Sequence, residues 1–429
     1  MEVFRIQGGC PLSGKVEISG SKNSSLPLFA ATLLTKEECI LENIPDLSDV
    51  RFMAEILEEM GAKVKRIKPT VWKINASDIT HSAPYHLVRK MRASICLLGP
   101  LVARLRKAKI PMPGGCVIGN RPVDLHVKAL LALGAAVELK AGTIEVDGKN
   151  LRGSSIFIGG RLGSTVTGTA NAIMTATLTS GKTVLEGCAC EPEIADLCEM
   201  LKSMGAQIRG VGSHTIEVEG VKSLSGCVHR VIPDRIETAT YALAAAITHG
   251  EISIYGANPR HLGAFSNLMQ ESGVEFHHMQ DHLTVRVSNS GIRPIEAATL
   301  PYPGFPTDLQ AQTCALACVA DGLSILTERV YPSRFMHVPE LMRMGAQISV
   351  EGASAIIHGV TNLKGAPVMA SDLRASAALI LAGLAAKGES CIRRIYHLDR
   401  GYGSFEKKLN SMGAKVERVS EDDLPISSF

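Results

Sequence analysis

The chain has 429 residues, and because a single hydrophobic core stops growing at roughly 250–300 residues, we expect two domains of about 200 residues each. Hydrophobic residues make up 45% of the sequence and charged residues 20%, which is typical of a globular protein, and no apolar run approaches the ~18 residues that a membrane-spanning helix needs. A net charge of +3 with only 4% aromatic residues supplies neither a basic stripe nor a stacking platform, so neither a membrane nor a nucleic acid is an expected partner.

The N-terminal segment MEVFRIQGGCPLSG lacks the apolar core of a signal peptide, so we expect the protein to remain in the cytoplasm. The sequence contains 11 cysteines, an odd number, and without an export signal they are expected to be free thiols. Cys188 and Cys190 are the one close pair, but no cluster of His or Cys accompanies them. We therefore interpret them as small buried residues and expect no zinc site.

One short motif recurs along the whole chain at intervals of roughly 70 residues. An amphipathic stretch with helical spacing precedes each copy, its Gly is placed as a helix C′ stop, and a short β-like run follows. The copies are MGAKV at 60–64, LGAAV at 133–137, MGAQI at 204–208, SGVEF at 272–276, MGAQI at 344–348 and MGAKV at 412–416.

A second helix is predicted upstream of every copy, and its residues are small and apolar on nearly all sides, which is typical of a buried helix. These segments are SLPLFAATLL, RASICLLGPLVARL, ANAIMTATLTSG, IETATYALAAAITHG, LQAQTCALACVADG and RASAALILAGLAAKG. Six such units predict an α/β fold with three units per domain, inner buried helices, outer strands and a boundary near residue 230. A solenoid is the alternative, but its repeats are shorter and need polar capping repeats at the ends.

Four of the six buried helices are predicted to carry a cation in the first turn, at Lys22, Arg92, Arg235 and Arg374. A cation in the first turn opposes the helix dipole and costs about 0.3–1 kcal/mol, so gathered helix starts of this kind predict a face that binds phosphate or carboxylate groups. For any single arginine the alternative is that it caps a carbonyl or pairs with a nearby acid. The six starts read Ser21-Lys22-Asn23, Met91-Arg92, Thr169-Ala170-Asn171, Asp234-Arg235, Thr307-Asp308 and Asp372-Leu373-Arg374.

The segment IPMPGGCVIGNRPVDLH, residues 110–126, is predicted to be a loop because its prolines and glycines fit neither a helix nor a central strand. Cys116 follows two glycines that allow movement, and Arg121 lies five residues on, where a cation favours the reactive thiolate. We predict a catalytic role for this thiol and expect the other ten cysteines to be buried or electrostatically ordinary. Core packing is the alternative for Cys116.

Three further polar residues at helix starts have two interpretations each. Asp124 and His126 are either ligand contacts or caps of the next helix. Asp308, within LPYPGFPTDLQAQ at 300–312, is either the N-cap of a buried helix or a carboxylate that accepts a proton during catalysis.

Taken together, the motifs resemble the UDP-N-acetylglucosamine enolpyruvyl transferase family, which catalyses the first committed step of peptidoglycan synthesis. The resemblance covers residues 1 to about 419 and rests on SGSKNSSLPL, VRKMRASI, PGGCVIGNRPVDLH, EPEI, IPDRIET, YPGFPTDLQAQ, RFMHVPELMRMGA, SDLRASA and IYHLDRGY. It implies two inside-out α/β barrel domains of three units each. Residues 22–232 would form the first, with a catalytic loop at 112–121 that orders on nucleotide-sugar binding, and residues 1–21 with 233–420 the second, followed by a polar tail at 421–429.

The resemblance also implies roles for individual residues, with phosphoenolpyruvate and UDP-N-acetylglucosamine as substrates and without a metal or cofactor. Lys22 and Asn23 would contact phosphoenolpyruvate, and Arg121 and Arg400 would hold its phosphate and carboxylate. Cys116 would deliver a proton and be the target of the phosphonate epoxide fosfomycin, while Asp308 would deprotonate the sugar hydroxyl. The nucleotide-sugar site would comprise Arg92, Arg121, Pro122, Val123, Asp124, Leu125, His126, Asp308 and Val330, and Arg334, Asp372 and Arg374 would complete the closed cleft.

The sequence departs from the family pattern at two places. Cys96 stands where the family usually has a Trp, and the segment GGRLGSTVTGTAN at 159–171 contains extra residues around Arg161, so the diphosphate contacts there are not assigned. A shikimate enolpyruvyl transferase is one alternative function, but the GNAGT segment of that enzyme is absent here. A non-catalytic UDP-sugar-binding protein on the same scaffold is the other.

Overall fold

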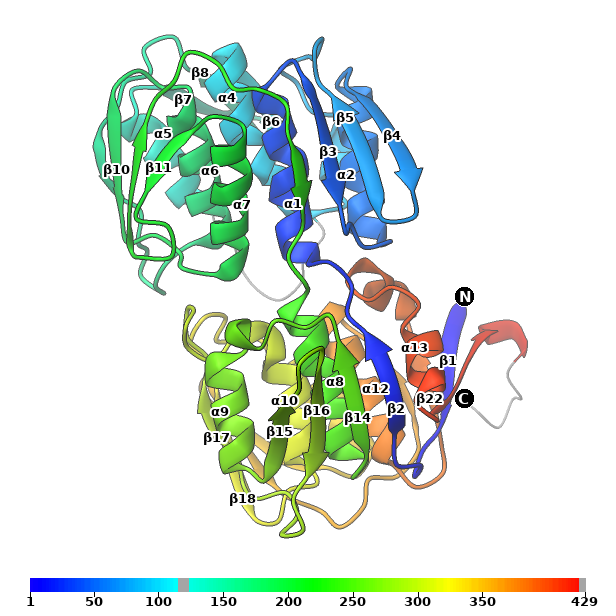
Figure 1. Cartoon of the computed structure of the whole chain (residues 1–429). Helices are drawn as coiled ribbons and strands as arrows, with labels where there is room; N and C mark the ends of the chain where they lie inside the picture. Colours follow the sequence, from blue (N-terminus) through cyan, green and yellow to red (C-terminus); the bar gives the residue numbers. More distant parts are fainter. Residues whose placement is uncertain (115–122, 424–429) are drawn as a thin grey trace. The chain divides into compact units, whose positions relative to one another are not determined.

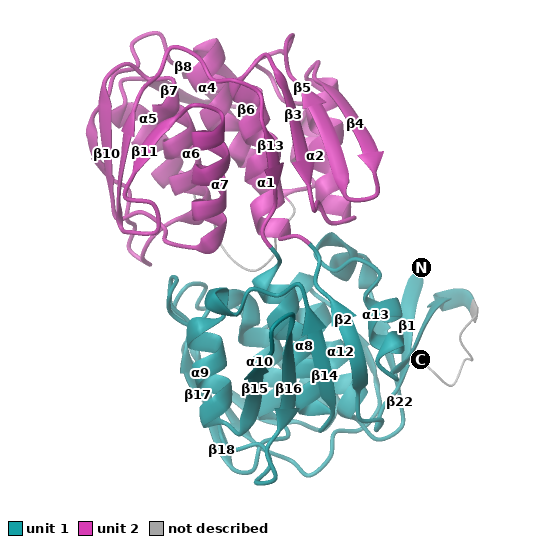
Figure 2. Cartoon of the chain, in the orientation of Figure 1, with its two compact units in different colours: residues 1–19, 117–119, 233–429 teal, residues 20–116, 120–232 magenta. Residues whose placement is uncertain are grey.

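The computed structural model describes residues 1–114 and 123–423. Within them the chain divides into two compact units (Figure 2). Unit 1 comprises residues 1–19 and 233–423, and unit 2 comprises residues 20–114 and 123–232. Each unit has its own hydrophobic core.

Both units are built from three copies of one arrangement of an inner helix, an outer helix and a sheet (Figure 1). The inner helices of unit 2 are α1 (Lys22–Ala31), α4 (Leu98–Leu105) and α6 (Val166–Thr177), and its outer helices are α2 (Ser48–Glu59), α5 (Asp124–Ala132) and α7 (Pro192–Ser203). Short helical segments η1 (Thr32–Leu34), α3 (Tyr85–Val88) and η2 (Arg92–Leu97) accompany them. In unit 1 the inner helices are α8 (Arg235–Ile247), α10 (Gln310–Ala317) and α12 (Leu373–Ala385), and the outer helices are α9 (Gly263–Glu271), α11 (Val338–Arg343) and α13 (Phe405–Ser411). Its short segments are η3 (Pro259–His261), η4 (Thr307–Leu309), η5 (Ile395–Arg400) and η6 (Glu421–Asp423).

The described residues form six sheets that share one pairing scheme. In each four-stranded sheet one edge pair is parallel and the other two pairs are antiparallel. The sheets of unit 2 are β13-β3-β5-β4, β6-β8-β7 and β11-β12-β10-β9, with strands β3 (Glu38–Glu42), β4 (Lys63–Lys68), β5 (Val71–Asn75), β6 (Lys107–Pro111), β7 (Ala136–Lys140), β8 (Thr143–Asp147), β9 (Ser155–Phe157), β10 (Lys182–Glu186), β11 (Gln207–Arg209), β12 (Thr215–Glu219) and β13 (Val228–Arg230). A parallel bridge from Ser82 to Lys109 stands at the fourth-strand position of the three-stranded sheet.

Unit 1 repeats the scheme with the first two strands of the chain included. Its sheets are β15-β16-β14-β2, β17-β18-β20-β19 and β21-β22-β1-β23. The strands are β1 (Glu2–Gln7), β2 (Ser13–Glu17), β14 (Glu251–Tyr255), β15 (Val274–His278), β16 (His282–Val287), β17 (Glu296–Ala298), β18 (Leu323–Thr327), β19 (Gln347–Glu351), β20 (Ser354–His358), β21 (Pro367–Met369), β22 (Glu389–Arg393) and β23 (Lys415–Ser420).

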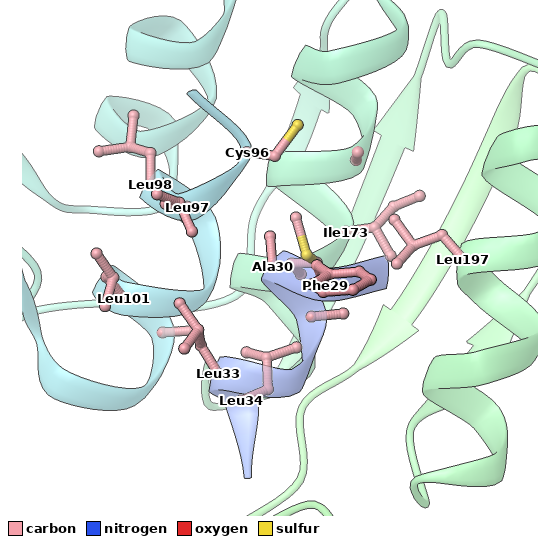
Figure 3. Packing of buried hydrophobic residues seen from close by; sticks show 14 of the residues in the cluster. Phe29, Ala30, Leu33, Leu34, Cys96, Leu97, Leu98, Leu101, Ile173 and Leu197 are labelled. Atoms are coloured by element: carbon pink, nitrogen blue, oxygen red, sulfur yellow. The ribbon is translucent and has the colours of Figure 1, made fainter. Parts of the chain in front are cut away.

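The inner helices are buried because their small side chains allow other elements to approach from every side. In unit 1 the helices α8, α10 and α12 contact one another, and sheets and outer helices cover them. In unit 2, Phe29 of α1 packs among Leu97, Ile173 and Leu197, which come from three other elements (Figure 3). The predicted fold of inner buried helices and outer strands, three units to a domain, is confirmed.

A glycine ends each outer helix in the left-handed conformation, which a residue with a Cβ rarely adopts. The φ angles are 105° at Gly61, 91° at Gly134, 103° at Gly205, 92° at Gly273, 91° at Gly345 and 91° at Gly413. At Gly61 a Cβ would also lie only 2.6 Å from the carbonyl oxygen of Asp78. The recurrent motif is therefore a helix stop, as its spacing predicted.

Among the described residues, no helix combines the length and the apolar character that crossing a membrane requires. The ten described cysteines are free thiols, and eight of them are buried. Cys96, at the position of the usual Trp, is one of the buried ones and packs in the core of unit 2 (Figure 3).

Candidate active site

The charged cluster of unit 1 is centred on Asp308, in the short helix η4. Arg334 donates from Nη1 to Asp308 Oδ1 at 3.1 Å, and Arg374 donates from Nη2 to Oδ2 at 2.9 Å. Both guanidinium groups are nearly buried, whereas the Asp308 side chain keeps 25% of its surface exposed. Two cations therefore orient a carboxylate that a ligand can still reach.

The N-cap interpretation of Asp308 is wrong. The residue before η4 is Pro306, no side chain caps this helix, and the Asp308 carboxylate is turned toward the arginines instead. A charged partner on each oxygen stabilises the carboxylate more than a single backbone N–H would.

Arg374 lies in the first turn of α12, where Asp372 is the N-cap and accepts from the backbone N–H groups of Arg374 at 3.0 Å and Ala375 at 3.2 Å. Arg374 Nη1 also donates to the Tyr402 hydroxyl at 3.1 Å. Burial lowers the pKa of Arg374, but Asp308 and Tyr402 outweigh it and hold that pKa above its usual value. The guanidinium is therefore permanently charged, and Asp372 has a structural role as a cap whatever else it contacts.

Lys22 is the first residue of α1 in unit 2, directly after the N-cap Ser21. Its Nζ lies 3.2 Å from Oδ2 of Asp49, which lies in the first turn of the outer helix α2 and is only 1% exposed. The lysine side chain itself is 13% exposed. The buried carboxylate fixes the ammonium group and leaves part of it accessible. Asn23 is the next residue of α1 and is half-buried.

His126 lies in α5, at 3% exposure, in a hydrogen-bonded group of unit 2. Asn171 accepts from the Gly99 N–H at 2.8 Å through Oδ1, so its Nδ2 is the donor to His126 Nδ1 at 2.8 Å. His126 Nε2 then carries the proton and faces Thr167 Oγ1 at 3.3 Å. Burial, with Arg92 as a second cause, lowers the pKa of His126 to about 4.

The remaining predicted site residues are spread over several elements. Cys116, Arg121 and Pro122 lie outside the described residues, as do most of the predicted loop at 112–121 and of the polar tail. The others are Arg92 at the start of η2, Val123 before α5, the exposed Asp124 and half-buried Leu125 in the first turn of α5, Val330 after β18, and Arg400 at the end of η5.

The capping interpretations of Asp124 and His126 are wrong, because the N-cap of α5 is Val123 and no side chain caps this helix.

The segment around Arg161, which the sequence marked as unusual, is also placed. Arg161 lies in an exposed turn closed by the bridge between Gly160 and Gly163. Cys227 departs from the expectation that the other thiols are buried or electrostatically ordinary, because it is half-buried and a hydrogen bond from Cys39 lowers its pKa against the effect of burial. The described residues contain no group of three or more His, Cys, Asp or Glu side chains that could hold a metal ion.

The family model for EPSP synthase (3-phosphoshikimate 1-carboxyvinyltransferase) matches residues 6–409. A UDP-N-acetylglucosamine 1-carboxyvinyltransferase from Methylacidiphilum infernorum is 51% identical over 98% of this chain and 99% of its own length, and one from Granulibacter bethesdensis is 49% identical over 98% and 100%. The chain belongs to the UDP-N-acetylglucosamine 1-carboxyvinyltransferase family. Among solved structures, the enolpyruvyl transferase NikO from Streptomyces tendae superposes with a TM-score of 0.88 at 26% identity, covering 97% of this chain and 98% of that one. EPSP synthase from Acinetobacter baumannii shares the fold, with a TM-score of 0.74 at 17% identity and coverage of 98% and 100%.

Within this family scaffold, sequence reasoning missed the groups that hold the predicted residues in place. Asp49 and Tyr402 were not assigned a role, although each contacts a predicted residue directly. Asn171, which contacts His126, was predicted to lie at a helix start, but α6 begins at Val166 and Asn171 lies inside it. Tyr402 belongs to the IYHLDRGY motif, which was the one signal that could have marked it. Asp49 looked like an ordinary acid in the first turn of an amphipathic helix.

The buried neutral state of His126 predicts a specific loss of stability in acid. Its folded-state pKa of about 4 lies below the ordinary value of 6.5, so the stability it contributes is fully present above pH 6.5 and is lost as the pH falls toward 4. Between pH 7.5 and 5.0 we expect the wild type to lose about 2 kcal/mol more than His126→Gln. Urea unfolding followed by fluorescence of Trp72, the single tryptophan, reports on unit 2.

His81→Gln is the matched control, because this histidine belongs to the same unit and is exposed to solvent. It should leave the pH dependence as in the wild type. An equal loss of stability in the wild type and in His126→Gln contradicts the assignment of a neutral ring.

Proposed function

We propose that this chain transfers the enolpyruvyl group of phosphoenolpyruvate to the C3 hydroxyl of UDP-N-acetylglucosamine and releases phosphate. The observation that carries the proposal is the identity of 47–51% to relatives named for this activity, over 98–99% of the chain. The product feeds peptidoglycan synthesis, and through it cell shape and division. Both substrates are cytoplasmic metabolites, so the proposed place of the reaction is the cytoplasm.

The proposed site for phosphoenolpyruvate uses Lys22, Asn23, Arg121 and Arg400. Phosphate and carboxylate groups bring several negative charges, which need cations and free backbone N–H groups. Lys22 meets this need at the start of α1, where Asp49 holds its ammonium group. Arg400 ends η5, and its neighbour Asp399 is anchored by Arg418 through bonds of 2.7 and 3.1 Å.

The proposed nucleotide-sugar site includes the cluster around Asp308. Asp308 is the base for the sugar hydroxyl, and Arg334, Arg374 and Asp372 complete the site. The supporting geometry is a reachable carboxylate fixed by two guanidinium groups. The residues assigned to bind the rest of the molecule are Arg92, the run from Arg121 to His126, and Val330.

The proposed reaction is an addition followed by an elimination. Cys116 supplies a proton to the methylene carbon of phosphoenolpyruvate, which makes the adjacent carbon electrophilic. The sugar oxygen attacks that carbon while Asp308 takes the hydroxyl proton, and loss of phosphate and of one methyl proton then forms the enol ether. The cations stabilise charge on the phosphate and the carboxylate, which is commonly the largest contribution in such sites.

The acceptor defines the first test. The purified chain should release phosphate from phosphoenolpyruvate with UDP-N-acetylglucosamine and show less than about 1% of that rate with shikimate 3-phosphate, because a site that hydrogen-bonds one acceptor leaves buried groups unpaired with another. A colorimetric phosphate assay measures both rates. Comparable release with shikimate 3-phosphate supports the alternative transferase, and binding of the nucleotide sugar without release supports a non-catalytic binding protein.

The role of Asp308 defines the second test. Asp308→Asn removes the base at almost constant size, so turnover should fall by about 10²–10⁴-fold. Steady-state kinetics separate this loss from weaker binding, and Asp321→Asn, at an exposed position of the same unit, is the control that keeps normal turnover. Turnover of Asp308→Asn within threefold of the wild type excludes the base assignment.

The reactive thiol defines the third test, and Cys227 makes a control necessary. Cys116 should be alkylated by fosfomycin faster in the presence of UDP-N-acetylglucosamine, whereas Cys227, whose pKa is lowered by the hydrogen bond from Cys39, should be labelled by a general electrophile at a rate that the nucleotide sugar does not change. Peptide mass spectrometry of the wild type, Cys116→Ser and Cys227→Ser distinguishes the two thiols. Cys116→Asp should keep transfer activity and lose the inhibition.

Labelling of Cys116 at the same rate with and without nucleotide sugar contradicts a loop that orders on binding. Fosfomycin inactivation of Cys116→Asp at the wild-type rate contradicts the thiol as its target.

A further inference from the structure

Glu328 is a carboxylate with no exposed surface, directly after strand β18. Its Oε1 accepts from the backbone N–H groups of Val330 and Tyr331, both at 2.8 Å, and from the Thr299 hydroxyl at 2.7 Å. Its Oε2 accepts from the Thr307 hydroxyl at 2.8 Å. A buried carboxylate is costly unless donors surround it, and four donors meet that requirement here. The two oxygens contact different segments. Oε1 holds the turn that carries Val330, and Oε2 accepts from Thr307 of η4.

The Thr307 hydroxyl lies between this carboxylate and the cluster around Asp308, and the donor and the acceptor of each of its two hydrogen bonds are fixed. Arg334 Nη1 donates to Thr307 Oγ1 at 3.0 Å, and an arginine cannot accept. The single hydroxyl proton is therefore left for Glu328. The bond from Thr307 to Glu328 and the bond from Arg334 to Thr307 consequently form together.

The orientation of Arg334 depends on this link. Among the described residues its three hydrogen bonds all use Nη1, which donates to the Thr307 carbonyl at 3.0 Å, to the Thr307 hydroxyl at 3.0 Å and to Asp308 Oδ1 at 3.1 Å. Its Nε is buried and has no hydrogen-bond partner in the described part of the chain. A guanidinium group held through one nitrogen rotates if one of its acceptors moves.

We propose that Glu328 is a positioning residue for the transfer reaction. Through Thr307 it orients Arg334, and Arg334 in turn holds the Asp308 carboxylate in the direction in which it accepts the sugar proton. The inference rests on the proposed function for its kinetic consequence, whereas the geometric part concerns the folded chain alone. A misplacement of about 1 Å at a reacting group can lower a rate about 10²-fold.

Glu328→Gln tests the link. The amide oxygen can replace Oε1 toward the turn, but the amide nitrogen in place of Oε2 is a donor, so the Thr307 hydroxyl proton loses its acceptor and the hydroxyl has to reorient. We expect kcat to fall about 10–100-fold with both KM values within about threefold of the wild type. Thr307→Val, which removes the hydroxyl at nearly constant shape, should likewise lower kcat and leave both KM values nearly unchanged. Thr307→Ser, which keeps the hydroxyl, should keep the wild-type kcat.

Two comparisons separate positioning from general stability. Thr299→Val removes the other hydroxyl on Glu328 but no contact of Arg334, so it should lower the melting temperature and leave kcat within threefold. Glu328→Gln in the Thr307→Val background should cost little more than Thr307→Val alone, because the link is already broken. Additive losses of kcat, or a wild-type kcat in Glu328→Gln, overturn the proposal.

Crystal structures of the wild type and of Glu328→Gln decide the geometric part without any activity. The proposal expects the bond from Arg334 to Asp308 to be lost or redirected in the variant and kept in Thr299→Val. An unchanged Arg334 overturns it, even if the wild type proves inactive in transfer. An inactive wild type with a displaced Arg334 in the variant refutes the proposed function and leaves the positioning role standing.

Discussion

The burial of the inner helices is the constraint on which the rest of the structure depends. Every residue from Ile236 to Ile247 of α8 is buried, and so is every residue from Arg374 to Leu384 of α12. Side chains along such helix bodies can only pack. The inner helices can therefore offer groups to a ligand only at their starts, where backbone N–H groups are not used within the helix and solvent can approach. The same architecture explains why the predicted ligands are anions.

A cation in the first turn of a helix is locally unfavourable, and the structure supplies an individual compensation for it. Lys22 pairs with Asp49 at 3.2 Å, and Arg374 pairs with Asp308 at 2.9 Å. The guanidinium of Arg235 lies 5.6 Å from the centre of the Tyr302 ring. For Arg374 the alternative from the sequence, pairing with an acid, is confirmed, and Lys22 is paired in the same way. Such pairing does not exclude an anion-binding role, because it fixes the position of the cation.

The fold was largely predictable from the sequence because its determinants are local. The recurrent glycines, such as Gly61 and Gly413, mark helix ends through a backbone conformation that only nearby residues influence. For the candidate site, the sequence predicted residues that lie within recognisable motifs, but not the contacts between residues that are distant in the sequence. Asp308 and Arg374 are 66 residues apart and belong to separate units of the repeat, so their contact arises from the packing of those units. Thr307 and Glu328 lie within one unit but are 21 residues apart, beyond the reach of any local pattern. A single acid that follows an apolar strand, as Glu328 does, has no sequence pattern that would predict its burial or its contacts.

The buried charges of unit 1 are better explained by activity than by stability. Desolvating a carboxylate between two guanidinium groups costs several kcal/mol per ion, and well-packed apolar residues at such places are often as stable or more so. The cluster around Asp308 nevertheless includes Arg334 and Arg374, both nearly buried, and behind it lies the fully buried Glu328. Each of these groups restricts the direction of the next. Such a chain of directed hydrogen bonds preorganises one carboxylate, and preorganised polar groups are what a reaction that moves a proton requires.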